Sequence, residues 1–236
     1  MKKTSILLLL LAICLIIAGC GRTETNNAAV NSAANSQNAA VDPDDDHSGA
    51  TAPPNTAQPE SRNCLVICFS RTGEQYTVGV IDKGNTAIVA EMIAEKTGAD
   101  LFEVLPADDH YPMTYKELTD VAKQEQNEKA RPAYSGDVPD LTQYDTVFIG
   151  APVWWGDWPM IMYTFFEKNA ETLSGKNLVP FSTHEGSGLS GFDRKLSAAI
   201  PGSTVLKGLA IRGNDAQNKQ DDVRKDVESW LSGLNY

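Results

Sequence analysis

The sequence predicts a doubly wound α/β domain, in which a five-stranded parallel sheet carries helices on both faces. The first observation is an alternation of five strand-like apolar runs with five helix-like segments between residues 62 and 236. The second is the run CLVICF at residues 64–69. It is apolar at every position, which is typical of a strand buried on both faces of a parallel sheet. Chain chirality makes the crossovers right-handed.

The later strands are short apolar runs between polar or turn-forming residues. DLFEVL at 100–105 and DTVFIG at 145–150 are expected to form the second and third strands. NLVPFST at 177–183 and TVLKGLAI at 204–211 are expected to form the fourth and fifth. Ligands in such folds bind beyond the carboxyl ends of the strands. The loops after strands one, three and four are therefore the candidate site.

Five helices are expected between and after these strands. Apolar residues at helical spacing mark a helix at 85–97, which ends at Gly98 because glycine readily adopts the left-handed conformation that closes helices. A polar helix is expected at 114–130, before Pro132, and another at 159–168. A short helix carries Phe192, Leu196 and Ile200, and the last helix carries the apolar stripe Val223, Val227, Trp230, Leu231 and Leu234.

The first 61 residues are expected to lie outside the domain. Residues 1–19 are typical of a signal peptide, with two lysines before an apolar run too short to span a bilayer comfortably. IAGC at 17–20 resembles a lipobox, which implies a lipid-anchored Cys20 and a place in the cell envelope outside the cytoplasm. The alternative is an ordinary cleaved signal. Residues 20–61 have few large apolar side chains and predict a disordered tether, which leaves 62–236 as the domain.

Charge and cysteine usage exclude some classes of function. The chain has 20 basic and 31 acidic residues, a net charge of −11, which is unfavourable for nucleic-acid binding because phosphate contacts need Lys and Arg. Cys64 and Cys68 lie four residues apart in the first expected strand, about 13 Å by strand geometry. They cannot form a disulfide with each other, and we expect both to be small buried residues.

The loop after the first strand predicts an anion site. SRTG at 70–73 and GNT at 84–86 look like two halves of a phosphate-binding loop, separated by an insertion at 74–84. Ser70, Arg71 and Thr72 offer polar side chains, while Asn85 and Thr86 begin a helix, where free N–H groups favour an anion. Residues 79–86 nearly match GxxxxGK[ST], but asparagine replaces the lysine that reaches a triphosphate. A terminal monophosphate is therefore favoured over a nucleoside triphosphate. A capped helix with a polar turn is the alternative.

The other two loops predict an aromatic ligand. After strand three come Pro152, Val153, Trp154, Trp155 and Gly156, with a further tryptophan at 158. Tryptophans at a binding edge favour a flat aromatic ligand, although some of them could instead attach the loop to the core. After strand four come Thr183, His184, Glu185, Gly186 and Gly188. These glycines could allow close approach of a ligand, and His184 is expected to contact the ligand or a loop atom rather than act as a base.

Together the three loops describe a flavin mononucleotide (FMN) site, and the sequence resembles the flavodoxin family, within it the flavodoxin-like bacterial lipoproteins. The motifs that carry the resemblance are SRTG…GNT, GAPVWWGDWP at 150–159 and STHEGSG at 182–188. The resemblance covers about residues 63–234 and implies a strand order of 2-1-3-4-5 with noncovalently bound FMN. It places the phosphate at Ser70, Thr72, Asn85 and Thr86, and the flavin beside loops 152–156 and 183–188.

A flavin carries one or two electrons, so the first functional hypothesis is electron transfer at the extracytoplasmic face of the membrane, with redox proteins or small electron acceptors as partners. The alternatives are an FMN-dependent NAD(P)H:quinone-type oxidoreductase and a binding module that no longer holds flavin. The insertion is expected to form a hairpin or ordered lobe beside the flavin. Finally, DDHSGAT at 45–51 resembles the DxxSGAT signal for covalent FMN attachment, which would place an FMN on Thr51.

Overall fold

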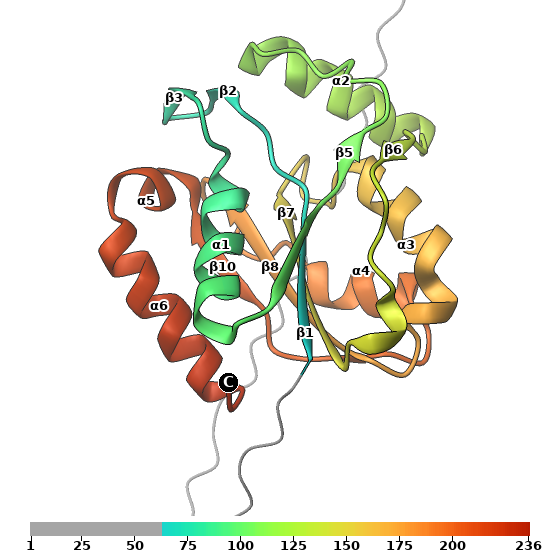
Figure 1. Cartoon of the computed structure of the whole chain (residues 1–236). Coiled ribbons are helices and arrows are strands. Elements are labelled where there is room, and N and C mark those ends of the chain that lie inside the picture. Colours follow the sequence, from blue (N-terminus) through green and yellow to red (C-terminus); the bar gives the residue numbers. More distant parts are fainter. Residues whose placement is uncertain (1–62) are drawn as a thin grey trace, which may run out of the picture. The chain divides into compact units, whose positions relative to one another are not determined.

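The computed structural model describes residues 63–236, and Figure 1 shows a central sheet in this part of the chain. The main sheet has the strand order β10-β8-β7-β1-β4, and every pairing in it is parallel. In the order of the predicted strands this is 2-1-3-4-5, so the doubly wound fold and its strand order are confirmed. Its strands are β1 (Cys64–Cys68), β4 (Asp100–Glu103), β7 (Thr146–Pro152), β8 (Asn177–His184), β9 (Thr204–Val205) and β10 (Leu209–Arg212).

The helices lie on both faces of this sheet (Figure 1). They are α1 (Asn85–Thr97), α2 (Tyr115–Glu128), α3 (Met160–Leu173), α4 (Phe192–Ala199), α5 (Gly213–Asn218) and α6 (Gln220–Gly233), with a 3-10 turn at Leu141–Gln143. The bounds of α1 are those predicted, and Gly98 closes it at φ 70°. The prediction missed α5 and ended α3 five residues early.

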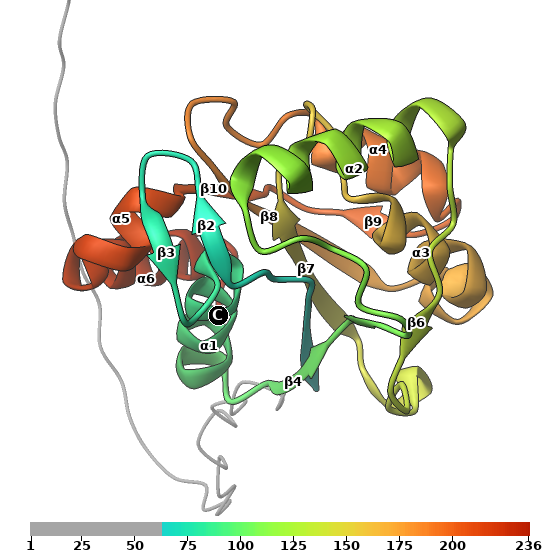
Figure 2. The same cartoon turned by 90° about the horizontal axis from the view of Figure 1, so that it is seen from above.

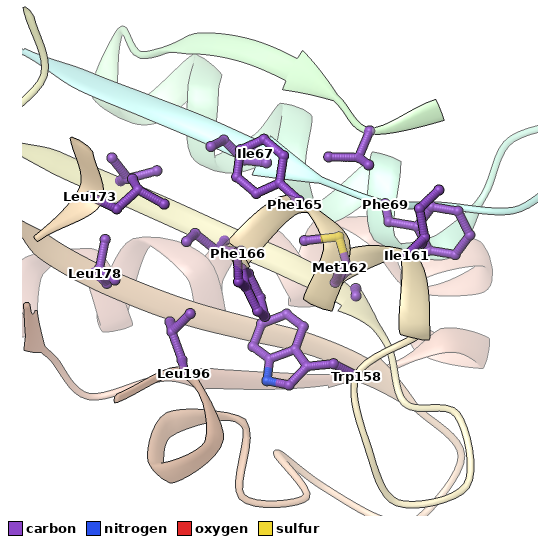
Figure 3. Close-up of a cluster of buried hydrophobic side chains, with 14 of the residues drawn as sticks. Ile67, Phe69, Trp158, Ile161, Met162, Phe165, Phe166, Leu173, Leu178 and Leu196 are labelled. Atoms are coloured by element: carbon purple, nitrogen blue, oxygen red, sulfur yellow. The ribbon is translucent and has the colours of Figure 1, made fainter. Parts of the chain in front are cut away.

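Alternate side chains of β1 enter two different cores. Leu65, Ile67 and, directly after the strand, Phe69 pack with α3 and α4, whereas Val66 and Cys68 pack with α1 and α6. Figure 3 shows the first of these clusters, in which Phe166 of α3 lies beside Trp158. Both faces of β1 are therefore buried, as its unbroken apolar sequence predicts. The two cysteines of this strand are buried thiols, and burial raises the pKa of the Cys68 thiol far above its usual range.

The fifth strand differs from the prediction because it is split into β9 and β10. Thr204 pairs with Asn177, but Leu209 pairs with Phe181, so the fifth strand holds one extra residue between these two pairs. The break lies beside Pro180, whose carbonyl oxygen would be 2.7 Å from a side-chain carbon at Gly208. Proline has no N–H group to donate to a neighbouring strand, which interrupts the ladder at this point.

Two small antiparallel ribbons accompany the sheet. One joins β2 (Gly73–Gln75) to β3 (Gly79–Ile81), and this is the hairpin predicted for the insertion. The other joins β5 (Leu105–Pro106) to β6 (Tyr134–Ser135) and was not predicted. The predicted second strand, 100–105, is therefore shorter than expected: β4 ends at Glu103, and Leu105 belongs to this ribbon. No helix among residues 63–236 is long and apolar enough to cross a membrane. Cys20, Thr51 and the tether lie outside the described residues.

Candidate functional site

A cavity of about 320 Å³ lies at the carboxyl ends of β1, β7 and β8. Figure 2 shows the β2–β3 hairpin and α2 above this edge of the sheet. The residues that line the cavity come from all three predicted loops, the hairpin, α2 and the start of α5. They are Ser70, Arg71, Gln75, Tyr76, Asn85, Thr86, Tyr115, Leu118, Thr119, Ala122, Pro152, Val153, Trp154, Trp155, Gly156, Thr183, His184, Glu185, Ser187 and Gly213.

The two halves of the broken loop meet at Gly84. A side-chain carbon at this position would lie 2.1 Å from Ser70 Oγ and 2.7 Å from the carbonyl oxygen of Arg71. Gly84 has φ −67° and ψ 144°, a conformation open to any residue, so lack of space is what requires glycine here. Ser70 Oγ accepts the N–H of Ala87 at 3.0 Å and so attaches the first half of the loop to α1.

The first turn of α1 keeps donors for an anion. A helix leaves its first N–H groups without intrahelical partners. Within residues 63–236, no acceptor takes the N–H groups of Asn85 and Thr86. The buried hydroxyls of Thr86 and Thr183 lie 2.7 Å apart and join α1 to β8. One of these hydroxyls donates its proton to the other, so the pair keeps one O–H donor for a ligand.

Other polar groups of this end are engaged in the protein itself. The side-chain oxygen of Asn85 accepts from Gln217 at 2.8 Å, so Asn85 would offer its backbone N–H instead. Glu185 accepts the N–H of Asn214 at 2.7 Å and lies 3.5 Å from Arg212. The Arg71 guanidinium forms an ion pair with Asp109 at 2.8 Å and donates to the Tyr111 carbonyl at 2.9 Å. Arg71 therefore lines the cavity with its charge already paired, while its buried Nε–H has no hydrogen-bond partner among the described residues.

Thr72 is not among the residues that line the cavity, and its place beside the phosphate group stays a prediction. The chain turns away at Gly73, where φ is 87° and a side-chain carbon would lie 2.7 Å from the Met113 carbonyl oxygen. The Thr72 carbonyl accepts from Gln75 at 3.3 Å, inside the hairpin. Thr72 therefore belongs to the base of the hairpin.

The three tryptophans of the β7 loop have different environments. Trp158 is fully buried and stacks on Phe192 with ring centroids 3.6 Å apart, so it belongs to the core. Trp154 packs edge-on against Phe69 at 5.4 Å and lines the cavity. Trp155 is 52% exposed at the tip of the loop, and its ring nitrogen donates to the Thr119 carbonyl at 2.9 Å. Of the three, Trp154 and Trp155 line the cavity and are available to a ligand.

The β8 loop presents His184 in a defined protonation state. The N–H of Gly186 donates to its Nδ1 at 2.8 Å, which leaves the proton of the neutral ring on Nε2. Burial lowers the pKa of His184 below its usual value, so the ring is neutral at pH 7. His184 therefore makes a loop hydrogen bond, one of the two roles predicted for it, and offers Nε2–H to the cavity it lines.

The predicted glycines of this loop do not line the cavity. Gly186 and Gly188 have φ values of 132° and 60°, and a side-chain carbon at either would meet no protein atom within 4 Å. They are needed for backbone conformation, and their close approach to a ligand stays a prediction. The Gly188 carbonyl accepts from Ser182 at 3.1 Å.

The hairpin and α2 form one wall of the cavity, and none of the predicted site residues lies on these two elements. Glu74 accepts the N–H of Tyr115 at 2.8 Å, and its own N–H donates to the Met113 carbonyl at 2.8 Å. From α2, Leu118, Thr119 and Ala122 line the cavity. The only sequence signal for them was Leu118 and Ala122, which lie four residues apart in a mostly polar helix.

Comparisons with known proteins place the chain among flavoproteins. A family model described as Flavodoxin matches residues 78–230. A candidate flavoprotein from Bacteroides eggerthii is 28% identical with a TM-score of 0.58, covering 74% of this chain and 98% of its own. One from Bacteroides uniformis is 27% identical, with a TM-score of 0.55 and coverage of 72% and 98%. A Lactobacillus acidophilus flavoprotein solved with FMN is 22% identical, with a TM-score of 0.50 and coverage of 67% and 97%, and shows the fold alone. No curated protein matches the chain.

Proposed function

The chain belongs to the flavodoxin family, and on that premise we propose that it binds FMN in the cavity above β1, β7 and β8 and uses it for electron transfer at the outer face of the membrane. The observation that carries the proposal is the closure of the loop at Gly84. It brings the Ser70 side of the loop against the first turn of α1, where donors for a phosphate remain.

The residues present fit FMN at both ends of the cavity. At the polar end, the N–H groups of Asn85 and Thr86 and the hydroxyl pair of Thr86 and Thr183 would hold the phosphate. At the other end, Trp154 and Trp155 offer rings to a flat aromatic system. When bound, FMN supplies one- or two-electron transfer.

The remaining groups would orient the cofactor and set its electrostatic surroundings. His184 offers Nε2–H as a hydrogen-bond donor from a neutral ring. Arg71 adds little positive charge to the cavity because Asp109 pairs with it. The net charge of −11 disfavours further negative charge on a reduced cofactor, which lowers its reduction potential.

A second candidate, the FMN-dependent NAD(P)H:quinone-type oxidoreductase, is supported by the hairpin and α2. These two elements add a wall to the cavity, with Tyr76 and Tyr115 on it, and such a wall suits a small-molecule acceptor as well as a protein partner. Steady-state turnover with NADH or NADPH and a quinone distinguishes the enzyme from a carrier that exchanges electrons only with redox proteins.

The envelope location rests on the sequence. Lipid on Cys20 would anchor the chain, and the acidic domain would gain nothing from an anionic lipid surface. A chain secreted unfolded would capture FMN after translocation, and covalent attachment at Thr51 would prevent its loss. Both modifications are proposals about residues 1–62.

The visible spectrum of the purified mature chain tests FMN binding. We expect bound flavin after purification or after incubation with FMN, and a loss of affinity of about tenfold or more when Thr86 and Thr183 are both changed to valine, because the hydroxyl donor that this pair keeps for the phosphate disappears. Thr164→Val, which changes another buried threonine on α3, is the matched control. A chain that binds no FMN under any of these conditions is instead the binding module that has lost its flavin.

A further inference from the structure

Three exposed aromatic side chains gather at the mouth of the cavity, on elements that are far apart in sequence. Tyr76 on the hairpin is 56% exposed and stacks on Tyr115 at the start of α2, with ring centroids 5.4 Å apart and planes 27° apart. Trp155 is 52% exposed, and all three line the same cavity. A contiguous group of exposed apolar side chains often marks a binding site.

The wall that bears these rings is held in place by several hydrogen bonds. Glu74 joins the hairpin to the start of α2, as described above, and the Thr77 carbonyl accepts from Asn214 of α5 at 3.4 Å. Trp155 is fixed on α2, because its ring nitrogen donates to Thr119 and its carbonyl accepts from Gln126 at 3.2 Å. The rings are therefore positioned before any ligand arrives, which reduces the entropy cost of binding.

This part of the cavity carries no charge of its own. The lining residues from the hairpin, α2 and the tip of the β7 loop are uncharged, and the two charged lining residues, Arg71 and Glu185, are both in ion pairs. Lys123 lies over the Trp155 ring at 5.0 Å but is not one of the residues that line the cavity. An ionic ligand would lose its hydration here without gaining a partner, whereas a neutral aromatic ring would lose little.

We infer that Tyr76, Tyr115 and Trp155 form a subsite for a flat, uncharged aromatic molecule, next to the cofactor position. This inference rests on the proposed function, since it names the class of small molecule that exchanges electrons with the bound cofactor. It also separates the roles of the aromatic residues: Trp154, which is packed on Phe69, belongs to the cofactor, the tyrosine pair belongs to the second molecule, and Trp155 contacts both.

The test is a calorimetric titration of the mature chain, with and without FMN, using 2,3-dimethyl-1,4-naphthoquinone, whose blocked ring positions resist addition of thiols. 1,4-Naphthoquinone-2-sulfonate is the charged probe, and 1,4-cyclohexanedione is the non-aromatic one. The variants are Tyr76→Ala, which removes the ring, and Tyr76→Phe, which keeps it. Val80→Ala is the matched control, because Val80 is exposed on the same hairpin and does not line the cavity.

We expect the neutral naphthoquinone to bind together with FMN, the sulfonate to bind more weakly, and the cyclohexanedione not to bind measurably. Tyr76→Ala should weaken naphthoquinone binding about tenfold, since both the stacking contact and the area buried against the ring are lost. Tyr76→Phe and Val80→Ala should change it less than twofold, and all three should leave FMN affinity within threefold.

Three results would overturn the inference. They are displacement of naphthoquinone by FMN, a tenfold loss of FMN affinity in Tyr76→Ala, and naphthoquinone binding that Tyr76→Ala leaves unchanged. Failure of the proposed function would look different. The wild-type chain would then bind no FMN, and titration of the FMN-free chain with naphthoquinone would still decide whether the aromatic subsite exists.

Discussion

Gly84→Ala is the sharpest test of how the cavity is built. The added carbon would lie 2.1 Å from Ser70 Oγ, 2.7 Å from the Arg71 carbonyl oxygen and 2.9 Å from the Arg71 nitrogen. The Ser70 hydroxyl can rotate away, at the cost of its bond to Ala87. The Arg71 backbone cannot move without shifting the loop away from α1. Overpacking of this kind costs about 1–3 kcal/mol.

Part of that cost is offset in the unfolded chain. Replacing glycine by alanine lowers the entropy of the unfolded state, which stabilises the fold by about 0.4–1 kcal/mol where the conformation allows it. The backbone angles of Gly84 do allow it, so the net loss of stability should be about 1–2 kcal/mol. The affinity for FMN should fall by tenfold or more, because the phosphate donors on the two sides of the loop move apart.

Urea unfolding and titration of flavin fluorescence measure these two quantities. Gly233→Ala is the matched control. Gly233 is the last residue of α6, its φ is not positive, and a side-chain carbon there would meet no atom within 4 Å. The control should be as stable as the wild type or more so, and should bind FMN equally well. The reasoning is refuted if Gly84→Ala unfolds at the wild-type urea concentration and binds FMN within twofold of the wild type.

The other predictions concern the tryptophans, a histidine, the hairpin and the tether. Trp158→Ala should lower the free energy of unfolding by about 3–5 kcal/mol in urea because a fully buried ring is lost. Trp154→Ala and Trp155→Ala should cost less stability but weaken FMN binding and its quenching of tryptophan fluorescence; unchanged affinity and quenching in both would make the loop purely structural. A hydrogen bond to Glu125 raises the pKa of His110. The resulting stabilisation is complete below about pH 6.5 and is lost as the pH rises through the raised value. The melting temperature should therefore fall more from pH 6 to pH 8 in the wild type than in His110→Gln, and parallel curves would contradict this. Replacing residues 74–83 with a short linker should keep FMN affinity within tenfold but alter the rates of electron transfer to external acceptors. Loss of FMN binding would instead show that the hairpin is part of the phosphate-binding site. Coexpression with a flavin transferase should add the mass of an FMN phosphoester, measured by intact mass spectrometry, and Thr51→Ala should remove it; an adduct that persists in Thr51→Ala would disprove attachment there.

Local sequence signals were sufficient for the fold. The first strand is apolar at every position because two cores use its alternate side chains, and the first helix ends at Gly98 because the left-handed closing residue is a glycine. The break in the fifth strand was harder to foresee. Its cause is Pro180 in the neighbouring strand. The sequence alone does not show that Pro180 lies beside this part of the fifth strand, because it does not give the register between strands.

The site was predictable only where its residues follow strands directly. The loops after β1, β7 and β8 were found in this way, but the contributions of Leu118 and Tyr115 depend on where a polar helix lies in space. The sequence also could not distinguish Trp158, which is buried in the core, from Trp154, because both follow the same strand. Gly84 resembles an ordinary turn glycine until its distance to Ser70, fourteen positions earlier, is known.

Because β1 packs into both cores, the unfolding of the two helix layers depends on the same strand. Leu65 and Val66 are neighbours in sequence, yet each supports a different layer of helices. If either layer melted, the strand that aligns the other would lose half of its packing. The two layers should therefore unfold together in one cooperative transition. Because the phosphate loop directly follows β1, no partly unfolded state that has lost one layer should keep a working cavity, and thermal release of a bound cofactor should coincide with loss of the fold.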